Sequence, residues 1–76
     1  MPHVIVKLYA GRSEPQKARI AEEVAGAIMA TTGNGEDAVS VSIEDVQPSD
    51  WAETVYRPEI LAKPDTLYKK PGYNPL

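Results

Sequence analysis

The stretch VIVKLYAGRSEPQKARIAEEVAGAI, residues 4–28, decides the fold of this 76-residue chain. Residues 4–9 alternate between two faces, and a period of two with β-branched side chains predicts a strand. Gly11 ends this strand. Ser13 then lies three residues before Gln16, which is the spacing of a capping box. Pro15 falls in the first turn of the expected helix, where its missing N–H costs nothing.

The helix that begins after Ser13 is predicted to be amphipathic. Its apolar side chains Ile20, Val24, Ala27 and Ile28 follow the spacing i, i+4, i+7, i+8, and charged residues fill the other side. The Gly-Asn-Gly sequence at residues 33–35 stops the pattern, with the first glycine suited to the position just beyond the helix. The helix should therefore span about 18 residues.

A second strand is predicted over residues 39–46, where Val39, Val41 and Ile43 alternate with polar side chains. Strand, helix and strand form a β-α-β unit, so the strands should be parallel and joined by a right-handed crossover. Pro48 stops the second strand. A turn or short helix should begin at residues 49–51. Because four prolines follow, we expect only short helical pieces over residues 54–62 and 64–70, and an irregular tail after Gly72.

These elements predict an α+β fold, with a single domain over residues 1–76. Two parallel strands and one helix are too few for a stable fold alone. Small domains usually gain stability from disulfides, a metal or oligomerisation. The chain has no Cys, and its one His and lack of ligand spacing argue against a metal site. We therefore expect no metal and no cofactor, but a homo-oligomer whose sheet is completed by dimerisation.

Composition and charge argue against several classes of binding partner. The net charge is −3 and the eight basic residues are scattered, which argues against a nucleic-acid partner. No apolar run approaches the roughly 20 residues of a membrane span, so no membrane partner is expected. Charged residues occur early in the chain, at Lys7 and Arg12, so its first residues do not form the apolar region of a signal peptide. A cytoplasmic protein is the expectation.

Pro2 is the most informative residue for chemistry. Met is commonly removed before a small residue, and its removal here would leave a secondary amine at the start of the chain. An α-amino group has an ordinary pKa of about 7.7–8.0, which an apolar pocket or a nearby cation lowers. Such a group can act as a general base near neutral pH. The alternative is that Met-Pro is simply a common beginning.

The order Met1-Pro2, strand, Gly11-Arg12-Ser13, helix and second strand resembles the tautomerase superfamily, which includes 4-oxalocrotonate tautomerase. The resemblance covers about the first 50 residues. The remainder, including KKPGY at residues 69–73, is similar to a longer-tailed bacterial subgroup of phenylpyruvate-type tautomerases. The resemblance implies a tautomerase-like fold and an isomerase.

Site roles follow from the resemblance position by position. Pro2 would be the catalytic base and then the acid, Arg12 would hold the substrate carboxylate or the oxygen that gains charge, and Trp51 would form an aromatic wall. Ser40 replaces a second arginine of the oxalocrotonate enzymes, which disfavours a diacid and favours an apolar monocarboxylate. The residues alone leave other roles open: a solvated turn for Arg12, packing for Trp51 and a polar strand face for Ser40. His3 should be a spectator, since it points away from the face of Pro2.

The predicted function is keto–enol tautomerisation of 2-oxo acids, either phenylpyruvate-like enols or 2-hydroxydienoates, with the small-molecule substrate as the only partner besides other copies of the chain. Two alternatives remain at this stage. One is a non-catalytic small dimeric binding or regulatory module, and the other is a further superfamily reaction such as hydration, dehalogenation or decarboxylation. The oxalocrotonate enzymes are hexamers, but the longer tail favours a dimer here.

Overall fold

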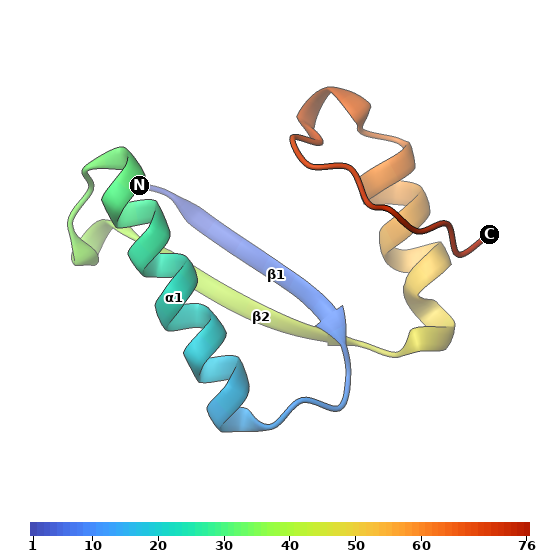
Figure 1. The fold of residues 1–76 in the computed structure, drawn as a ribbon, viewed down its shortest axis with the longest axis horizontal. Coiled ribbons are helices and arrows are strands. Elements are labelled where there is room, and N and C mark those ends of the chain that lie inside the picture. The colour runs from blue at the N-terminus through green and yellow to red at the C-terminus, as the bar shows by residue number, and fades with distance from the viewer.

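Two parallel strands and one long helix form the N-terminal two thirds of the protein (Figure 1). A computed structural model describes residues 1–76 and contains strand β1 (His3–Tyr9), helix α1 (Glu14–Thr32), a single 3₁₀ turn η1 (Glu36–Ala38) and strand β2 (Ser40–Val46). β1 and β2 pair in parallel as a two-stranded sheet. The predicted β-α-β unit is confirmed, with boundaries within one residue for both strands.

The ends of α1 are set by the residues that the sequence pattern indicated. Ser13 is the N-cap, and its side-chain oxygen accepts a hydrogen bond of 3.2 Å from the N–H of Gln16. Gly33 follows the helix with φ of 77°, a left-handed conformation that glycine adopts without steric cost. Its N–H donates to the carbonyl of Met29 at 3.0 Å and satisfies one of the last free carbonyls. The result is a helix of 19 residues.

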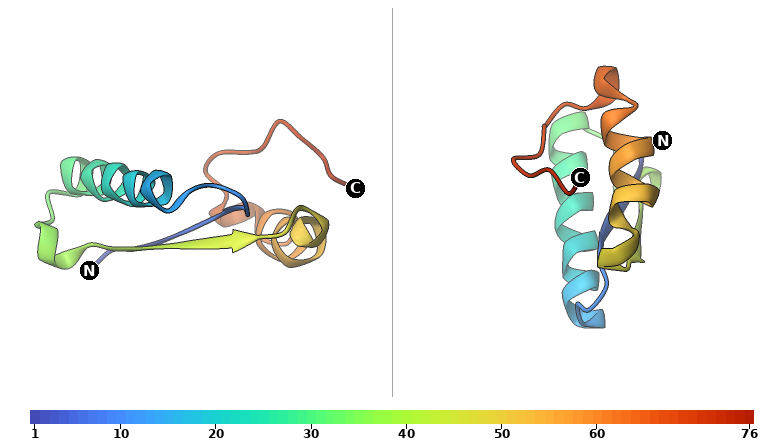
Figure 2. Two further views of the ribbon diagram at one scale, coloured as in Figure 1. Left: turned by 90° about the horizontal axis from the view of Figure 1, so that it is seen from below. Right: turned by 90° about the vertical axis from the view of Figure 1, so that its right-hand side faces the viewer.

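α1 covers one face of the sheet, and the opposite face is bare (Figure 2). Lys17 of α1 joins the two layers, because its Nζ lies 2.8 Å from Oδ2 of Asp45 on β2. The register pairs Asp45 with Leu8, so Leu8 lies on the covered face, and Ile5 points the other way. Ile5 is accordingly 52 % exposed. The sheet thus presents an apolar side chain to solvent.

The short helical piece predicted over residues 54–62 is present within two residues of those bounds, as a π-helix. After the turn η2 (Pro48–Asp50), a ten-residue π-helix, η3 (Ala52–Leu61), contains Pro58 in its interior. In an α-helix, the ring of Pro58 would crowd the carbonyl four residues earlier. The wider π turn bonds residues five apart, as in the 3.0 Å bond from the N–H of Ala62 to the carbonyl of Arg57. The π geometry therefore accommodates the proline inside this short helix.

The helical piece predicted over residues 64–70 is too long. Only a single turn, η4 (Pro64–Thr66), is present, and the chain from Leu67 onward is irregular. Pro71 disfavours a helical conformation at the residue before it. The few residues between η4 and Pro71 are too short a segment to sustain a helix. The irregular tail after Gly72 was predicted correctly.

The buried core of one chain is small and lies in the C-terminal region. Val55 and Tyr56, both on η3, are the only buried residues, each 6 % exposed. The ring of Tyr56 lies 5.8 Å from that of Tyr73 in the tail. The tail therefore packs back against η3.

An ion pair fixes η3 to the sheet. Nζ of Lys7 on β1 lies 2.6 Å from Oε2 of Glu59 on η3. This hydrogen bond and the charge of Glu59 raise the pKa of Lys7 above its ordinary value. A lysine whose pKa is raised on folding adds stability below its unfolded pKa of about 10.4, and loses that contribution as pH rises through the folded pKa.

We expect Lys7→Met to lower Tm by about 1–4 °C between pH 7 and 9. The difference from the unaltered protein should begin to shrink above about pH 10.4, where the lysine of the unfolded chain loses its charge, and should vanish only above the higher pKa of the folded protein. Thermal unfolding followed by circular dichroism across this range tests the expectation. Lys69→Met, which removes an exposed lysine without an ion-pair partner, is the control. An equal difference at pH 8 and pH 11 would contradict a role for the ion pair.

Candidate active site

One end of the sheet gathers Pro2, His3 and Ser40. The register pairs His3, the first residue of β1, with Ser40, the first residue of β2. Nδ1 of His3 and Oγ of Ser40 share a hydrogen bond of 2.6 Å. The N–H of Ser40 also donates to the carbonyl of Pro2 at 3.2 Å. The backbones of Pro2 and Ser40 are therefore neighbours, and the hydroxyl of Ser40 has an imidazole partner.

His3 is the residue at this end that sequence reasoning missed. Strand alternation predicts that its side chain points away from the face of Pro2. The alternation also places it on the face of Ser40, because directly paired residues of parallel strands share a face. A register prediction for the two strands would have found this contact.

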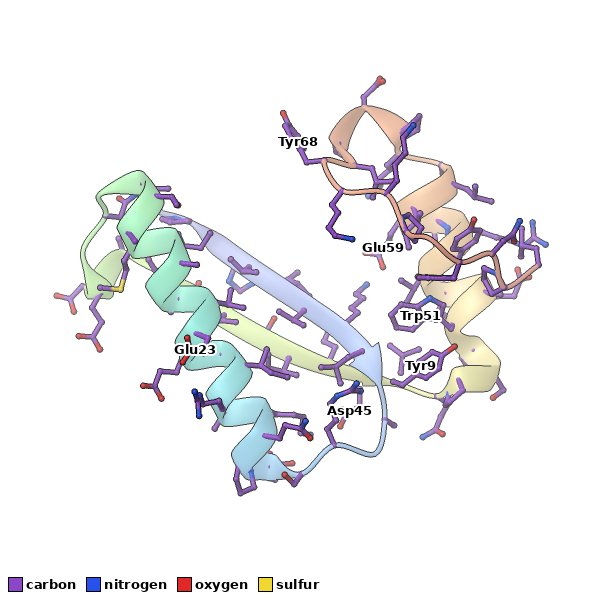
Figure 3. The ribbon with its side chains drawn as sticks, in the orientation of Figure 1. Tyr9, Glu23, Asp45, Trp51, Glu59 and Tyr68 are labelled. Atoms are coloured by element: carbon purple, nitrogen blue, oxygen red, sulfur yellow. The ribbon has the colours of Figure 1, made fainter.

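The opposite end of the sheet carries Arg12 and Trp51. Arg12 lies in the exposed turn after β1, and its Nη1 donates to the carbonyl of Tyr9 at 3.4 Å. The rings of Tyr9 and Trp51 meet edge to face, with centroids 5.2 Å apart and planes at 82° (Figure 3). Nε1–H of Trp51 donates to the hydroxyl of Tyr73 at 3.1 Å. An arginine and three aromatic rings thus lie at this end.

Arg12 differs from the other two arginines of the chain in its partners. Arg19 and Arg57 each pair with a glutamate four residues along their helices, at 3.2 and 2.9 Å. No carboxylate of the chain lies within ion-pair distance of Arg12. Its guanidinium is therefore free to bind the carboxylate of another molecule, in the fork geometry that arginine favours.

The three rings of Tyr9, Trp51 and Tyr73 line a hollow of about 270 Å³. No charged side chain contributes to its wall. A larger hollow of about 650 Å³ lies along α1, but Glu22, Glu23 and Glu36 contribute to its lining and would repel an anion. Of these two hollows, the aromatic one is the better match for an apolar group attached to a carboxylate.

The predicted site residues form two groups rather than one. Pro2 and Ser40 precede β1 and open β2, whereas Arg12 and Trp51 follow the two strands. Six steps along a strand separate the ends of β1, which corresponds to about 20 Å. One chain does not bring Pro2 within reach of Arg12. A small substrate cannot contact both groups of the same chain.

A model of the family described as "Tautomerase enzyme" matches residues 2–56. The chain belongs to the tautomerase family. The matched range contains all four predicted site residues, Pro2, Arg12, Ser40 and Trp51. The superfamily that the sequence was found to resemble is thereby confirmed, and the protein is an isomerase with tautomerase activity.

Relatives of known name cover the chain from end to end. A probable tautomerase of Xylella fastidiosa is 45 % identical over 76 residues, which is all of this chain and 93 % of the relative. Tautomerase PptA of Pectobacterium carotovorum is 41 % identical over 75 residues, covering 97 % of this chain and 99 % of that protein. The tail that carries Tyr73 is thus part of the similarity to the first relative.

Solved structures confirm the tautomerase fold. A 4-oxalocrotonate tautomerase isozyme of Methylibium petroleiphilum superimposes with a TM-score of 0.64 and 36 % identity. The superposition covers 66 % of this chain and 81 % of that one. None of the helices of this tautomerase combines the length and apolar character that crossing a bilayer requires.

Proposed function

We propose that this tautomerase interconverts the enol and keto forms of 2-oxo acids, with Pro2 as the base and then the acid. Phenylpyruvate-like enols and 2-hydroxydienoates are the substrate classes considered. Two observations about Pro2 support the proposal most directly. Its backbone lies beside that of Ser40, and Met1, the residue before it, is 98 % exposed. Since nothing in the fold holds Met1, its removal leaves the sheet intact and frees the secondary amine of Pro2.

One amine can carry out both proton transfers of the reaction. The nitrogen of Pro2 takes the hydroxyl proton of the enol, and the O–H electron pair becomes part of the new C=O bond. The electrons of the C=C bond then take the same proton from the prolyl ammonium at carbon. An amine with an ordinary pKa of about 7.7–8.0 suits both steps near neutral pH, and a nearby cation would bring it closer to 7.

Arg12 is the proposed carboxylate and oxyanion ligand. Its lack of an internal carboxylate partner supports this role. A guanidinium near the enol oxygen stabilises negative charge that develops during proton transfer. Ser40, which stands in place of a second arginine, supplies one hydroxyl rather than a charge, so the proposed substrate carries one carboxylate and an apolar remainder. Trp51 and its hollow receive that remainder.

A second copy of the chain completes the proposed site. The bare sheet face and the exposed Ile5 indicate that one chain leaves apolar surface uncovered. A two-fold axis that sets the two sheets antiparallel brings the Pro2 end of one copy beside the Arg12 end of its partner. The same arrangement extends the sheet past an open edge. We propose a homodimer, with two sites that each draw residues from both copies, and a cytoplasmic location.

We expect Pro2→Ala to lower kcat/KM for phenylenolpyruvate ketonisation by about 10²–10⁴-fold, the usual contribution of general acid–base catalysis. Ultraviolet absorbance follows the reaction, mass spectrometry confirms loss of Met1, and circular dichroism confirms the fold. Pro75→Ala, an exposed proline in the tail, is the matched control. A processed, folded Pro2→Ala protein with full activity would rule out the prolyl base. Protein that retains Met1 should be as inactive as this variant, because its proline nitrogen is an amide.

Mixing two inactive variants tests the shared site. Pro2→Ala and Arg12→Ala each remove one proposed site residue, at opposite ends of β1. Because each proposed site takes Pro2 from one copy and Arg12 from the other, a mixed dimer has one site with both substitutions and one site with neither. After equal amounts are mixed and allowed to exchange subunits, we expect about a quarter of the activity of the unaltered protein to return. Arg19→Ala, which removes a helix ion pair, should remain active by itself. No recovery after proven exchange would contradict the shared site, and a hexamer in light scattering would overturn the dimer.

We expect Ser40→Ala to lower kcat/KM by about 3–10-fold, the effect of one lost neutral hydrogen bond to substrate. Ser42→Ala is the control, since Ser42 lies two residues further on the same strand and makes no side-chain hydrogen bond within the chain. Steady-state kinetics with phenylenolpyruvate compare the two variants. Equal effects of both substitutions would show that Ser40 is only part of a polar strand surface.

A further inference from the structure

The C-terminal tail contributes a wall to the aromatic hollow. Tyr73 lies 22 positions after Trp51, yet its hydroxyl accepts the indole N–H at 3.1 Å. Its ring also lies 5.8 Å from that of Tyr56, which is buried on η3. Two contacts of different kinds therefore hold Tyr73 in place, although the backbone around it is irregular.

We propose that Tyr73 is a positioning residue that fixes the ring of Trp51 and so maintains a subsite for the aryl group of an aryl-substituted carboxylic acid. This inference rests on the proposed function, and it selects aryl enols over 2-hydroxydienoates as the substrates that fit best. It assigns to the tail a part in substrate binding rather than in packing alone.

The hydrogen bond fixes the indole because its N–H has no other partner in the chain. A half-buried Trp N–H that loses its partner must turn toward water or stay unsatisfied, and either change costs free energy. With the bond in place, Trp51 stands edge-on to Tyr9 at 82°. The two rings and Tyr73 then leave the hollow open between them.

The size and lining of the hollow fit an aromatic ring. Its volume of about 270 Å³ exceeds the roughly 150 Å³ of an apolar cavity that is known to hold benzene. Aromatic walls bind a further ring by edge or offset contacts, beyond the effect of apolar burial. A dienoate chain is thinner and gains fewer such contacts.

The position of Arg12 fits the acid group of the same molecule. Its guanidinium reaches the backbone carbonyl of Tyr9, whose ring forms one wall of the hollow. A carboxylate bound by Arg12 therefore lies close to the hollow, and the uncharged lining excludes the carboxylate from the hollow itself. A ring and a carboxylate joined by a short linker satisfy both groups.

Tyr73→Phe tests the positioning role, because it removes the hydroxyl and keeps the ring that contacts Tyr56. We expect KM for phenylenolpyruvate to rise about 3–10-fold with kcat nearly unchanged, as for the loss of a neutral hydrogen bond. KM for a 2-hydroxydienoate should change less than twofold. Trp51 is the only tryptophan, so its indole N–H resonance reports the lost bond directly. Tyr68→Phe, at a tyrosine that is 99 % exposed in the same tail, is the control and should leave all values unchanged.

Binding without turnover separates this inference from the proposed function. Quenching of Trp51 fluorescence by 3-phenylpropanoate, compared with butanoate, gives the preference for a ring. We expect the preference to fall at least threefold in Tyr73→Phe and further in Tyr73→Ala. If Pro2→Ala abolishes turnover but Tyr73→Phe keeps its KM, its ring preference and its indole resonance, the positioning role is wrong and the tautomerase proposal stands. If no enol is turned over but the ring preference depends on Tyr73, the subsite stands and the proposed reaction is wrong.

Discussion

Parallel pairing of β1 with β2 is the constraint on which the rest of the structure depends. A parallel pair places both strand beginnings at one end of the sheet and both strand ends at the other. Pro2 and Ser40 therefore meet at the first end, and the groups that follow the strands, Arg12 and Trp51, lie at the second. The crossover helix α1 imposes this pairing, because two strands joined by a long helix return in the same direction. The distribution of chemistry along the sheet is thus a consequence of topology.

The same topology explains why one chain is an incomplete enzyme. A seven-residue strand is a stiff spacer of about 20 Å, and no side chain spans that distance. The one α-helix, α1, covers one face of the sheet, so the other face and the strand edges stay open. The proposed partner copy therefore both completes the proposed site and pairs with an open strand edge. The ion pair between Lys7 and Glu59 contributes by holding η3, and with it Trp51, against the strand end where that partner is proposed to arrive.

Local sequence signals predicted the first 46 residues well, since the determinants there are local. Ser13 and Gly33 cap the helix through contacts a few residues away, and strand alternation is a property of neighbouring residues. The C-terminal region could not be predicted in the same way. The sequence predicted a helical piece across Pro58, but not the π geometry that accommodates the proline, because no sequence pattern indicates a π turn. Tyr73 meets Trp51 across 22 residues through an irregular tail, so its contact has no periodicity to reveal it.

The charge pattern of an acidic chain is consistent with an anionic substrate. With a net charge of −3, the protein as a whole repels anions, so a carboxylate needs a local cation that internal acids have not neutralised. Of the three arginines, Arg19 and Arg57 have carboxylate partners within the chain, whereas Arg12 has none. The unpaired guanidinium contacts the backbone of Tyr9, whose ring lines the uncharged aromatic hollow. Selectivity for an acid with an apolar remainder then follows from two neighbouring features, a free cation and a neutral wall, rather than from the overall charge.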